Sequence, residues 1–255
     1  GVCSGTLIHS EWALTAAHCF HNRPLFAKVF YGTTNKLLRN HSVNSAKVFI
    51  HPKFRYHLIY APYDIALIKL ANPIVLTNFV QLLPLDAKEW PQNFQYNRIC
   101  SVIGFGMNKY DNFTLHISKF IAKHGLTACS CLPYRKLICV DGIYQDGICM
   151  GDSGGPMICN GRLVGVTSAS VEIEGCSRRS LFSCAVKQKP EEERECGQTH
   201  ELHLFTYICP YLNWIKHYVD TVPSKPLSCK TNKLYRKEHI LYQLATIITI
   251  RLFIN

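Results

Sequence analysis

The chain has 255 residues, of which 47% are hydrophobic and 18% charged, so it is long enough for a large folded domain and lacks the composition of a disordered protein. Its formal net charge is +11, but residues 221–255 hold six Lys/Arg and one acid and the rest of the excess is dispersed, which argues against the basic patch of a nucleic-acid-binding protein. The 13 cysteines include no paired Cys-x-x-Cys motifs, so they argue against structural zinc and favour an oxidising compartment.

Short apolar or alternating segments follow one another along most of the chain, separated by clusters of Gly, Pro, Asn and Asp. They are GTLIHSEWALTAA, AKVFYG, AKVFIH, DIALIKL, ICSVIGFG, LHISKFIA and PMICNGRLVGVTSAS. Strand-length segments with turn signals between them predict an all-β barrel or sandwich. Residues 210–220 differ, because Leu212, Ile215 and Val219 recur at helical spacing after Pro210, which predicts one helix.

Two segments depart from the strand pattern. Residues 177–202 include the charge run KQKPEEERE between Cys184 and Cys196, which predicts an exposed inserted loop tied at its base. Residues 221–255 are basic and then apolar, but the apolar part is too short for a membrane span and is interrupted by polar residues. We therefore expect one domain over residues 1–220, a poorly ordered tail after it, and no membrane association.

The motifs LTAAHC, YDIALIKL and GDSGGP contain His18, Asp64 and Ser153, in that chain order. Singly, each has a structural explanation: a buried histidine, a strand-capping aspartate and a tight turn. Together on an all-β chain they favour a catalytic triad, because a serine nucleophile needs a base within hydrogen-bond reach and the base needs an acceptor that fixes its tautomer. The glycines around Ser153 would let backbone N–H groups approach a developing oxyanion.

With these motifs the chain resembles the serine endopeptidases of the chymotrypsin/trypsin family, from residue 1 to about residue 219. CSGTLIHSEWALTAAHC resembles the loop that ends in the catalytic histidine, ICSVIGFG the start of the second barrel, RLVGVTSAS the strand that lines the substrate cleft, and FTYICPYLNWIKHYV the last strand and helix. The resemblance implies an all-β fold of two six-stranded antiparallel β-barrels, here with the first barrel missing its N-terminal strand, plus a C-terminal helix.

The resemblance also implies roles for individual residues. His18 corresponds to the general base, Asp64 to the residue that orients it, and Ser153 to the nucleophile. The N–H groups of Gly151 and Ser153 correspond to the oxyanion hole, and Ser168 to the serine that hydrogen-bonds the triad aspartate. No cofactor and no metal is implied.

The family's disulfides map onto four pairs in this chain. They are Cys3–Cys19, Cys100–Cys159, Cys149–Cys176, and Cys139 with Cys129 or Cys131, of which we adopt Cys129–Cys139. Because 13 is an odd number, at least one thiol has no partner within the chain. Cys131, Cys209 and Cys229 remain without an assigned partner.

The expected specificity pocket departs from that of trypsin-like members, which carry an aspartate at its base. Counting back from Cys149 places Gly147 at the base, and Asp146 is one position too early. Without a buried carboxylate the attraction for Arg or Lys side chains is missing. The predicted preference is therefore not trypsin-like.

The walls of the pocket differ as well. The family's Ser-Trp-Gly cleft edge reads Ser168-Ala169-Ser170 here, and the second wall glycine aligns with His203. A histidine there could fill the pocket or donate to an acidic substrate side chain near neutral pH. In the alternative interpretation, the inserted loop shifts the register and His203 is an exposed loop residue.

The family is made as a zymogen, and cleavage frees an N-terminal ammonium that pairs with the aspartate before the serine, here Asp152. The chain starts just before its first cysteine, so we expect an N-terminally incomplete sequence without the propeptide and the cleavage site. Asp152 is then expected to lack an internal cation partner, and a buried unpaired carboxylate is costly. The cysteines and the N-glycosylation triplets at Asn40 and Asn112 favour a secreted, extracellular glycoprotein.

Two hypotheses of function follow. The leading one is a secreted serine endopeptidase that hydrolyses peptide bonds through a His-Asp-Ser triad and an acyl-enzyme intermediate. Its partners would be protein or peptide substrates and protein protease inhibitors, with no nucleic acid. The alternative is a catalytically silent protease homologue that acts as a protein-binding module, which the altered pocket and the large inserted loop favour.

Overall fold

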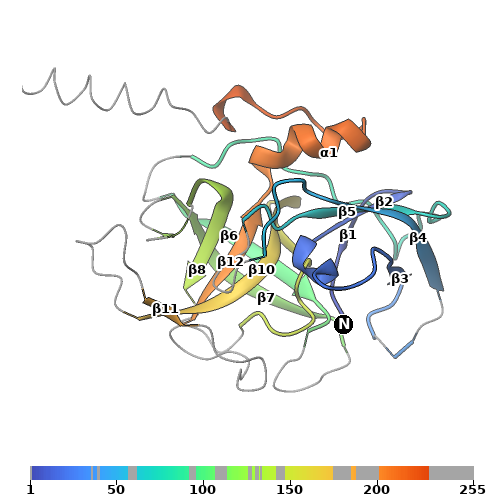
Figure 1. Cartoon of the computed structure of the whole chain (residues 1–255), viewed down its shortest axis with the longest axis horizontal. Helices are drawn as coiled ribbons and strands as arrows, with labels where there is room; N and C mark the ends of the chain where they lie inside the picture. Colours follow the sequence, from blue (N-terminus) through green and yellow to red (C-terminus); the bar gives the residue numbers. More distant parts are fainter. Residues whose placement is uncertain are drawn as a thin grey trace, which may run out of the picture.

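The computed structural model consists of two antiparallel β units side by side and one short helix above them (Figure 1). It describes residues 2–35, 37–38, 41–56, 62–91, 96–106, 114–125, 128–129, 132, 134–141, 147–174, 185–187 and 201–229. The predicted glycosylation sites Asn40 and Asn112 lie outside the described residues, as does most of the predicted inserted loop. Of residues 177–202 the structure describes a short strand at Ala185–Lys187 and the first two residues of β12, which begins at Glu201.

The first unit is a curled sheet of five strands in the order β1-β2-β5-β4-β3. The strands are β1 (Thr6–His9), β2 (Trp12–Thr15), β3 (Lys28–Tyr31), β4 (His41–Ile50) and β5 (Ala66–Leu70). Strand β5 is central, and its register pairs Leu67 with Leu14 of β2 and with Phe49 of β4. Because Leu14 and Leu67 are fully buried, this register holds the two strands that lead to His18 and away from Asp64.

The second unit is a closed barrel of six strands, extended at one edge by β11 (Ala185–Lys187). Its strands are β6 (Arg98–Gly104), β7 (His116–His124), β8 (Leu137–Asp141), β9 (Pro156–Cys159), β10 (Arg162–Glu174) and β12 (Glu201–Tyr207). Strand β9 pairs with both β6 and β10, which closes the barrel. The all-β fold expected from the sequence is confirmed, with one closed barrel and one curled half-barrel in the described residues.

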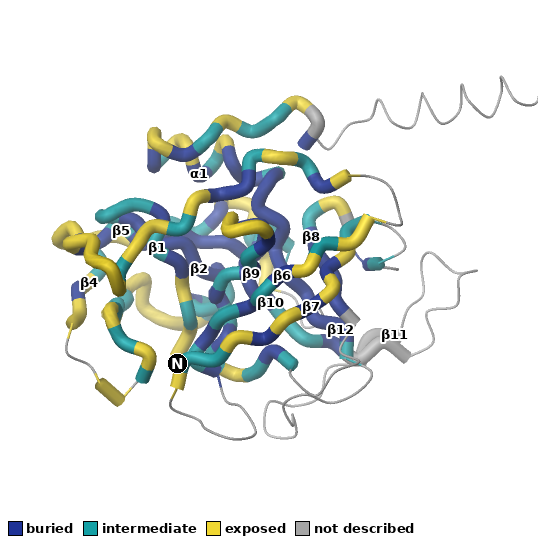
Figure 2. The backbone as a smooth tube through the Cα atoms, turned by 180° about the vertical axis from the view of Figure 1, so that it is seen from behind, coloured by how far each residue is buried: buried dark blue, intermediate teal, exposed yellow. Residues whose placement is uncertain are grey.

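Alternating side chains fix which face of the barrel strands is buried. In β7 the side chains of Ser118, Phe120 and Ala122 are buried, whereas Lys119 and Ile121 between them are exposed. This period of two is the pattern expected for a strand with one face on a core. Figure 2 shows that the buried stretches of chain gather where the two units meet.

The predicted C-terminal helix is present as α1 (Leu212–Tyr218), after a 3-10 turn at Cys209–Tyr211. Leu212 and Ile215 are fully buried, as their helical spacing predicts, and Tyr218 packs on Phe49 of the first unit with ring centroids 4.5 Å apart. The helix therefore ties the end of the second barrel to the first sheet. No helix of the described residues is long and apolar enough to cross a membrane.

A disulfide that the sequence left unassigned joins Cys209 to Cys229. Both cysteines are buried, and Val222 between them packs into the same core cluster. The segment after α1 is thus fastened to the domain through Cys229, nine residues past the boundary expected at 220. Residues 230–255 lie outside the described residues.

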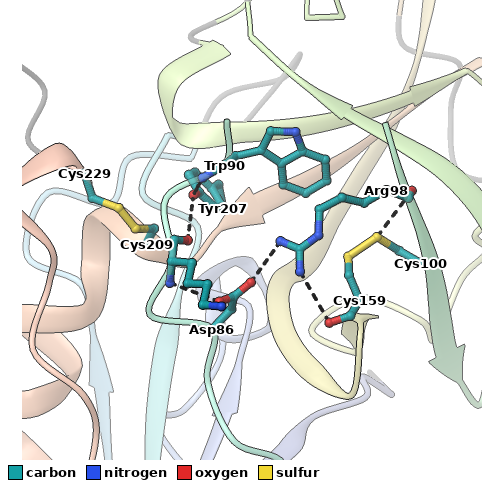
Figure 3. Close-up of polar contacts among 9 residues, drawn as sticks. Asp86, Trp90, Arg98, Cys100, Cys159, Tyr207, Cys209 and Cys229 are labelled. Atoms are coloured by element: carbon teal, nitrogen blue, oxygen red, sulfur yellow. Dashed lines mark hydrogen bonds and ion pairs between the residues drawn. A yellow bond between two sulfur atoms is a disulfide. The ribbon is translucent and has the colours of Figure 1, made fainter. Parts of the chain in front are cut away.

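A buried ion pair connects the segment between the two units to the second barrel (Figure 3). Arg98 Nη1 donates to Asp86 Oδ2 at 2.9 Å, and the two side chains are only 10% and 5% exposed. The guanidinium also lies 5.0 Å from the ring centroid of Trp90, whose backbone N–H donates to Tyr207 Oη at 2.7 Å. Both charges are therefore paired in a site that water barely reaches.

We expect Asp86→Ala to lower the free energy of unfolding by about 3–5 kcal/mol, because it leaves the Arg98 guanidinium buried without its counter-charge. Chemical denaturation with the disulfides intact measures this loss. The matched control is Glu11→Ala, which removes the Glu11–Lys69 pair, whose side chains are 39% and 31% exposed, and which should cost less than about 1 kcal/mol. Equal losses for the two variants would contradict this assignment.

Candidate active site

The carboxylate of Asp64 lies with no exposed surface between the two β units. Its Oδ1 accepts the backbone N–H of His18 at 2.8 Å, and its Oδ2 contacts His18 Nδ1 at 2.7 Å and accepts Ser168 Oγ–H at 2.6 Å. Its backbone carbonyl accepts Thr206 Oγ1–H at 2.9 Å. Because an ionised carboxylate can only accept, His18 Nδ1 carries the proton, which leaves Nε2 as the basic nitrogen.

His18 sits in a single 3-10 turn, Ala17–Phe20, directly after β2. The disulfide Cys3–Cys19 fixes the turn to the start of the chain, and the His18 side chain remains 21% exposed. The local sequence explains this arrangement, since small buried alanines at 16 and 17 let the turn pack under the sheet. The imidazole is held at its Nδ1 edge by the Asp64 carboxylate.

Ser153 lies just before β9 of the second barrel and is close to the turn that contains His18. Its carbonyl oxygen lies 3.9 Å from Cys19 Sγ, and a ring nitrogen of His18 lies within 4.8 Å of that sulfur. Ser4 N–H donates to the Ser153 carbonyl at 2.8 Å, which fixes the serine against the first unit.

The backbone around Ser153 turns so that amides are left free. Gly151 has φ of +101°, which a residue with a side chain rarely adopts. Its carbonyl accepts Ser4 Oγ–H at 2.8 Å, whereas Gly154 N–H and Gly155 N–H are used within the fold. In the described part of the chain, the N–H groups of Gly151 and Ser153 have no acceptor, so both are available to an incoming oxyanion.

Asp152 has a histidine beside it that the sequence did not indicate, and the expectation that it lacks an internal cation partner stays a prediction, because the ring is a cation only if it is protonated. His116 Nε2 lies 3.3 Å from Asp152 Oδ2. The sequence gave no sign of this contact because His116 is 36 positions away (residue 116 against residue 152), and only the pairing of β7 with β6 brings it to this place. Ser4 and Thr206 are two further residues that sequence reasoning missed, since neither lies within a motif that marks a role.

The predicted pocket residues lie on neighbouring elements of the second barrel. Ser168 and Ser170 are in β10, His203 is opposite Ser170 in β12, and Gly147 precedes the Cys149 turn. The Ser168 hydroxyl is committed to Asp64. Asp146, the residue one position before the expected base, lies outside the described residues.

His203 is fully buried in β12, which excludes the alternative of an exposed loop residue. Its Nδ1 lies 2.8 Å from Ser170 Oγ, and its ring meets Phe120 edge-on with centroids 5.9 Å apart. Burial lowers the pKa of His203 to about 4, so the ring is neutral at pH 7. Its Nε2 is buried and has no hydrogen-bond partner among the described residues.

Three disulfides that the resemblance implies join segments of the two β units. Cys3–Cys19, Cys100–Cys159 and Cys129–Cys139 are present, and they are pairs that the resemblance implies. Cys149 is also disulfide-bonded, but its expected partner Cys176 lies outside the described residues. Cys131, Cys184 and Cys196 lie outside them as well.

Comparison with known proteins agrees with this geometry. The family model described as Trypsin matches residues 1–189. The chain belongs to the trypsin family of serine proteases. It is 31% identical over 236 residues to the chymotrypsin-like elastase family member 1 of Felis catus, covering 85% of this chain and 78% of that protein.

The chain is also similar to another sequence relative and to a solved structure of a serine protease. It is 30% identical over 226 residues to the trypsin of Sus scrofa, which covers 84% of each protein. Among solved structures it is similar to neuropsin, a serine protease expressed in the limbic system of mouse brain, with a TM-score of 0.65 and 25% identity over 86% of this chain and 89% of that one. In each of these comparisons the similarity covers more than four fifths of this chain and of its relative.

The burial of His203 predicts an acid-dependent loss of stability. The unfolded state binds a proton at His203 below about pH 6.5, whereas the folded state does so only below about pH 4. The folded state should therefore lose about 3 kcal/mol as the pH falls from 6.5 to 4, and be insensitive to His203 above that window.

Denaturation curves of the wild type and His203→Leu across this pH range measure the effect. The variant should lose less stability than the wild type as the pH falls, because the other histidines are common to both proteins. Parallel stability curves for the two proteins would contradict a buried neutral His203.

Proposed function

We propose that the protein is a secreted serine endopeptidase that hydrolyses peptide bonds through His18, Asp64 and Ser153. The observation that carries the proposal is the buried Asp64 carboxylate, which fixes both the backbone and the Nδ1 of His18 beside the loop that holds Ser153. A histidine held in this tautomer is ready to accept a proton at Nε2. Membership in the trypsin family supports the same chemistry.

In the proposed reaction, Ser153 Oγ attacks the carbonyl carbon of the substrate while His18 Nε2 accepts the hydroxyl proton. The N–H groups of Gly151 and Ser153 stabilise the negative charge that develops on the carbonyl oxygen. His18 then donates the proton to the leaving amine, and an acyl-enzyme remains on Ser153. Water, activated by His18, hydrolyses the ester and regenerates the serine. Asp64 stabilises the imidazolium in both steps through its contact with Nδ1.

The partners of such an enzyme are protein or peptide substrates and protein protease inhibitors. Its disulfides are most compatible with an oxidising, extracellular environment, which supports secretion. The alternative function, a silent homologue that binds proteins, is favoured by the crowded pocket around His203. Covalent labelling of Ser153 by an active-site probe distinguishes the endopeptidase from the silent homologue.

We expect a fluorophosphonate probe to label the protein on Ser153, because only an activated serine reacts with it at an appreciable rate. Ser153→Ala should abolish labelling and lower kcat/KM by an amount on the order of 10⁶-fold. Mass spectrometry of the labelled peptide and a peptide-cleavage assay measure the two effects. Ser224→Ala, at an exposed serine far along the chain, is the matched control and should label like the wild type. The assay uses the full-length, activated protein, and an activated wild type that is not labelled would show a silent homologue.

We also propose that the specificity pocket does not select Arg or Lys. Gly147 offers no carboxylate at the expected base, and the neutral His203 ring occupies the place of a wall glycine. Both features remove the attraction for a long cationic side chain. Removing the imidazole should reopen the pocket for larger side chains.

A peptide library should therefore show no preference for cleavage after Arg or Lys. His203→Gly should raise kcat/KM for substrates with a large uncharged side chain at the cleaved position by about tenfold or more, because the pocket gains the volume of the ring. Ranking cleavage rates for both proteins with one library is the measurement. Strong wild-type cleavage after Arg or Lys would contradict the proposed pocket.

A further inference from the structure

A pocket of about 430 Å³, here called the lysine pocket, lies outside the proposed active site. Clefts of about 300–1,000 Å³ are the usual binding sites of small organic ligands. Five segments of the chain form its wall, namely residues 51–53, Tyr63, Lys136, residues 210–211 and Lys225. None of the residues assigned above to the triad, the oxyanion hole or the specificity pocket is among them. The lysine pocket is therefore separate from the groups proposed to carry out the reaction.

The lining of the lysine pocket is strongly cationic. Three of its residues are the lysines Lys53, Lys136 and Lys225, and none of its residues is Asp or Glu. In the part of the chain that the structure describes, no carboxylate forms an ion pair with any of the three. Like charges around one space repel one another, and an anion between them offsets that repulsion. The pocket thus offers three positive charges without a counter-charge.

Lys136 is held at the pocket by an aromatic ring. It ends a short 3-10 turn directly before β8, and its Nζ lies 3.7 Å from the ring centroid of Tyr63. The Tyr63 ring also stacks on the imidazole of His51, with centroids 4.9 Å apart. A hydrogen bond from Lys136 lowers the pKa of the Tyr63 hydroxyl, and the charges of Lys136 and Lys53 act in the same direction. The ammonium group of Lys136 therefore has a defined place in the pocket wall.

The other two lysines have fixed backbones. Lys53 N–H donates to His51 Nδ1 at 3.2 Å, and Lys225 N–H donates to Asn213 Oδ1 at 2.8 Å. The segment that carries Lys225 is also fastened to the domain by the disulfide of Cys229. A backbone that is already fixed reduces the ordering cost of binding, so the pocket is organised before a ligand arrives.

His51 contributes a neutral ring to the lining. Burial, followed by the nearby charges of Lys53 and Lys136, lowers its pKa to about 4. Because Nδ1 accepts the Lys53 N–H, Nε2 carries the proton of the neutral ring. The charge of the lining at pH 7 is therefore that of its lysines, and their effect on His51 indicates a positive potential at the pocket wall.

We propose that the lysine pocket binds a phosphate or sulfate group, free or as the ester of a small molecule, with Lys53, Lys136 and Lys225 as its ligands. The oxygens of such a group accept hydrogen bonds from several ammonium groups at once, and lysine commonly binds phosphate as a point charge. A dianion also balances more of the charge than a single carboxylate, which would leave two lysines unpaired. The volume has room for the organic part of an ester.

Isothermal titration calorimetry of the full chain tests this site. The probes are glycerol phosphate, inorganic phosphate and inorganic sulfate, at one ionic strength set with chloride. Lys136→Gln and Lys225→Gln each remove one charge from the pocket. Lys119→Gln is the matched control, because it removes the same charge from the exposed face of β7. Ser153→Ala separates binding from catalysis.

The wild type and Ser153→Ala should bind saturably and with equal affinity. Lys136→Gln and Lys225→Gln should each weaken binding by about tenfold or more, as expected when one hydrogen bond to a charged group is lost. Lys119→Gln should bind like the wild type. Tighter binding of glycerol phosphate would identify an ester as the ligand and tighter binding of an inorganic ion would identify the free ion, and both results support the site.

Equal weakening in all three lysine variants would overturn the proposal, because the anion would then respond to the net charge of +11 and not to the pocket. A wild type that binds none of the three probes saturably would overturn it as well. The inference does not depend on the proposed hydrolysis. Saturable binding to a protein whose Ser153 is not labelled by a fluorophosphonate would contradict only the endopeptidase function.

Discussion

The buried carboxylate of Asp64 is the constraint on which the site depends. It lies at the junction of the two β units and accepts hydrogen bonds from a turn of the first unit, through His18, and from a strand of the second, through Ser168. An ionised carboxylate without these donors would cost several kcal/mol to bury. The need to satisfy it therefore fixes the relative position of the units together with that of the imidazole.

Asp152, the residue directly before Ser153, is a second buried acidic residue whose carboxyl group accepts hydrogen bonds. Its carboxylate is equally buried, and its donors are two backbone amides and the ring of His116. The Asp64 carboxylate orients the ring of His18, and Asp152 directly precedes Ser153 in the chain. Each of the two buried carboxyl groups contacts a histidine, His18 from the first unit and His116 from the second.

The residues proposed to form the specificity pocket are where this chain departs from the trypsin pattern expected from its sequence. His203 takes the place of a small wall residue, is packed against Phe120, and is bonded to Ser170 across the strand pair. Its burial keeps it neutral at pH 7, so the ring contributes volume and a polar edge rather than charge. The departure lies in the proposed pocket residues, while the hydrogen bonds around Asp64 join the residues that the resemblance brought together.

The sequence by itself determined the features that are local or that follow a period. Alternation predicted the strands, the spacing of Leu212, Ile215 and Val219 predicted the helix, and the order of three short motifs indicated the family. It also singled out His18, Asp64 and Ser153, because each stands in a motif of unusual composition.

Only the tertiary structure decided the contacts that join distant segments. The pairing of Asp152 with His116, the bond from Ser4 to the Gly151 carbonyl across 147 positions, and the disulfide Cys209–Cys229 have no local pattern. The position of His203 was also open, because it depended on the strand register after an inserted loop. Strand pairing sets these distances, and a side chain gives no sign in the sequence of which residue will stand opposite it.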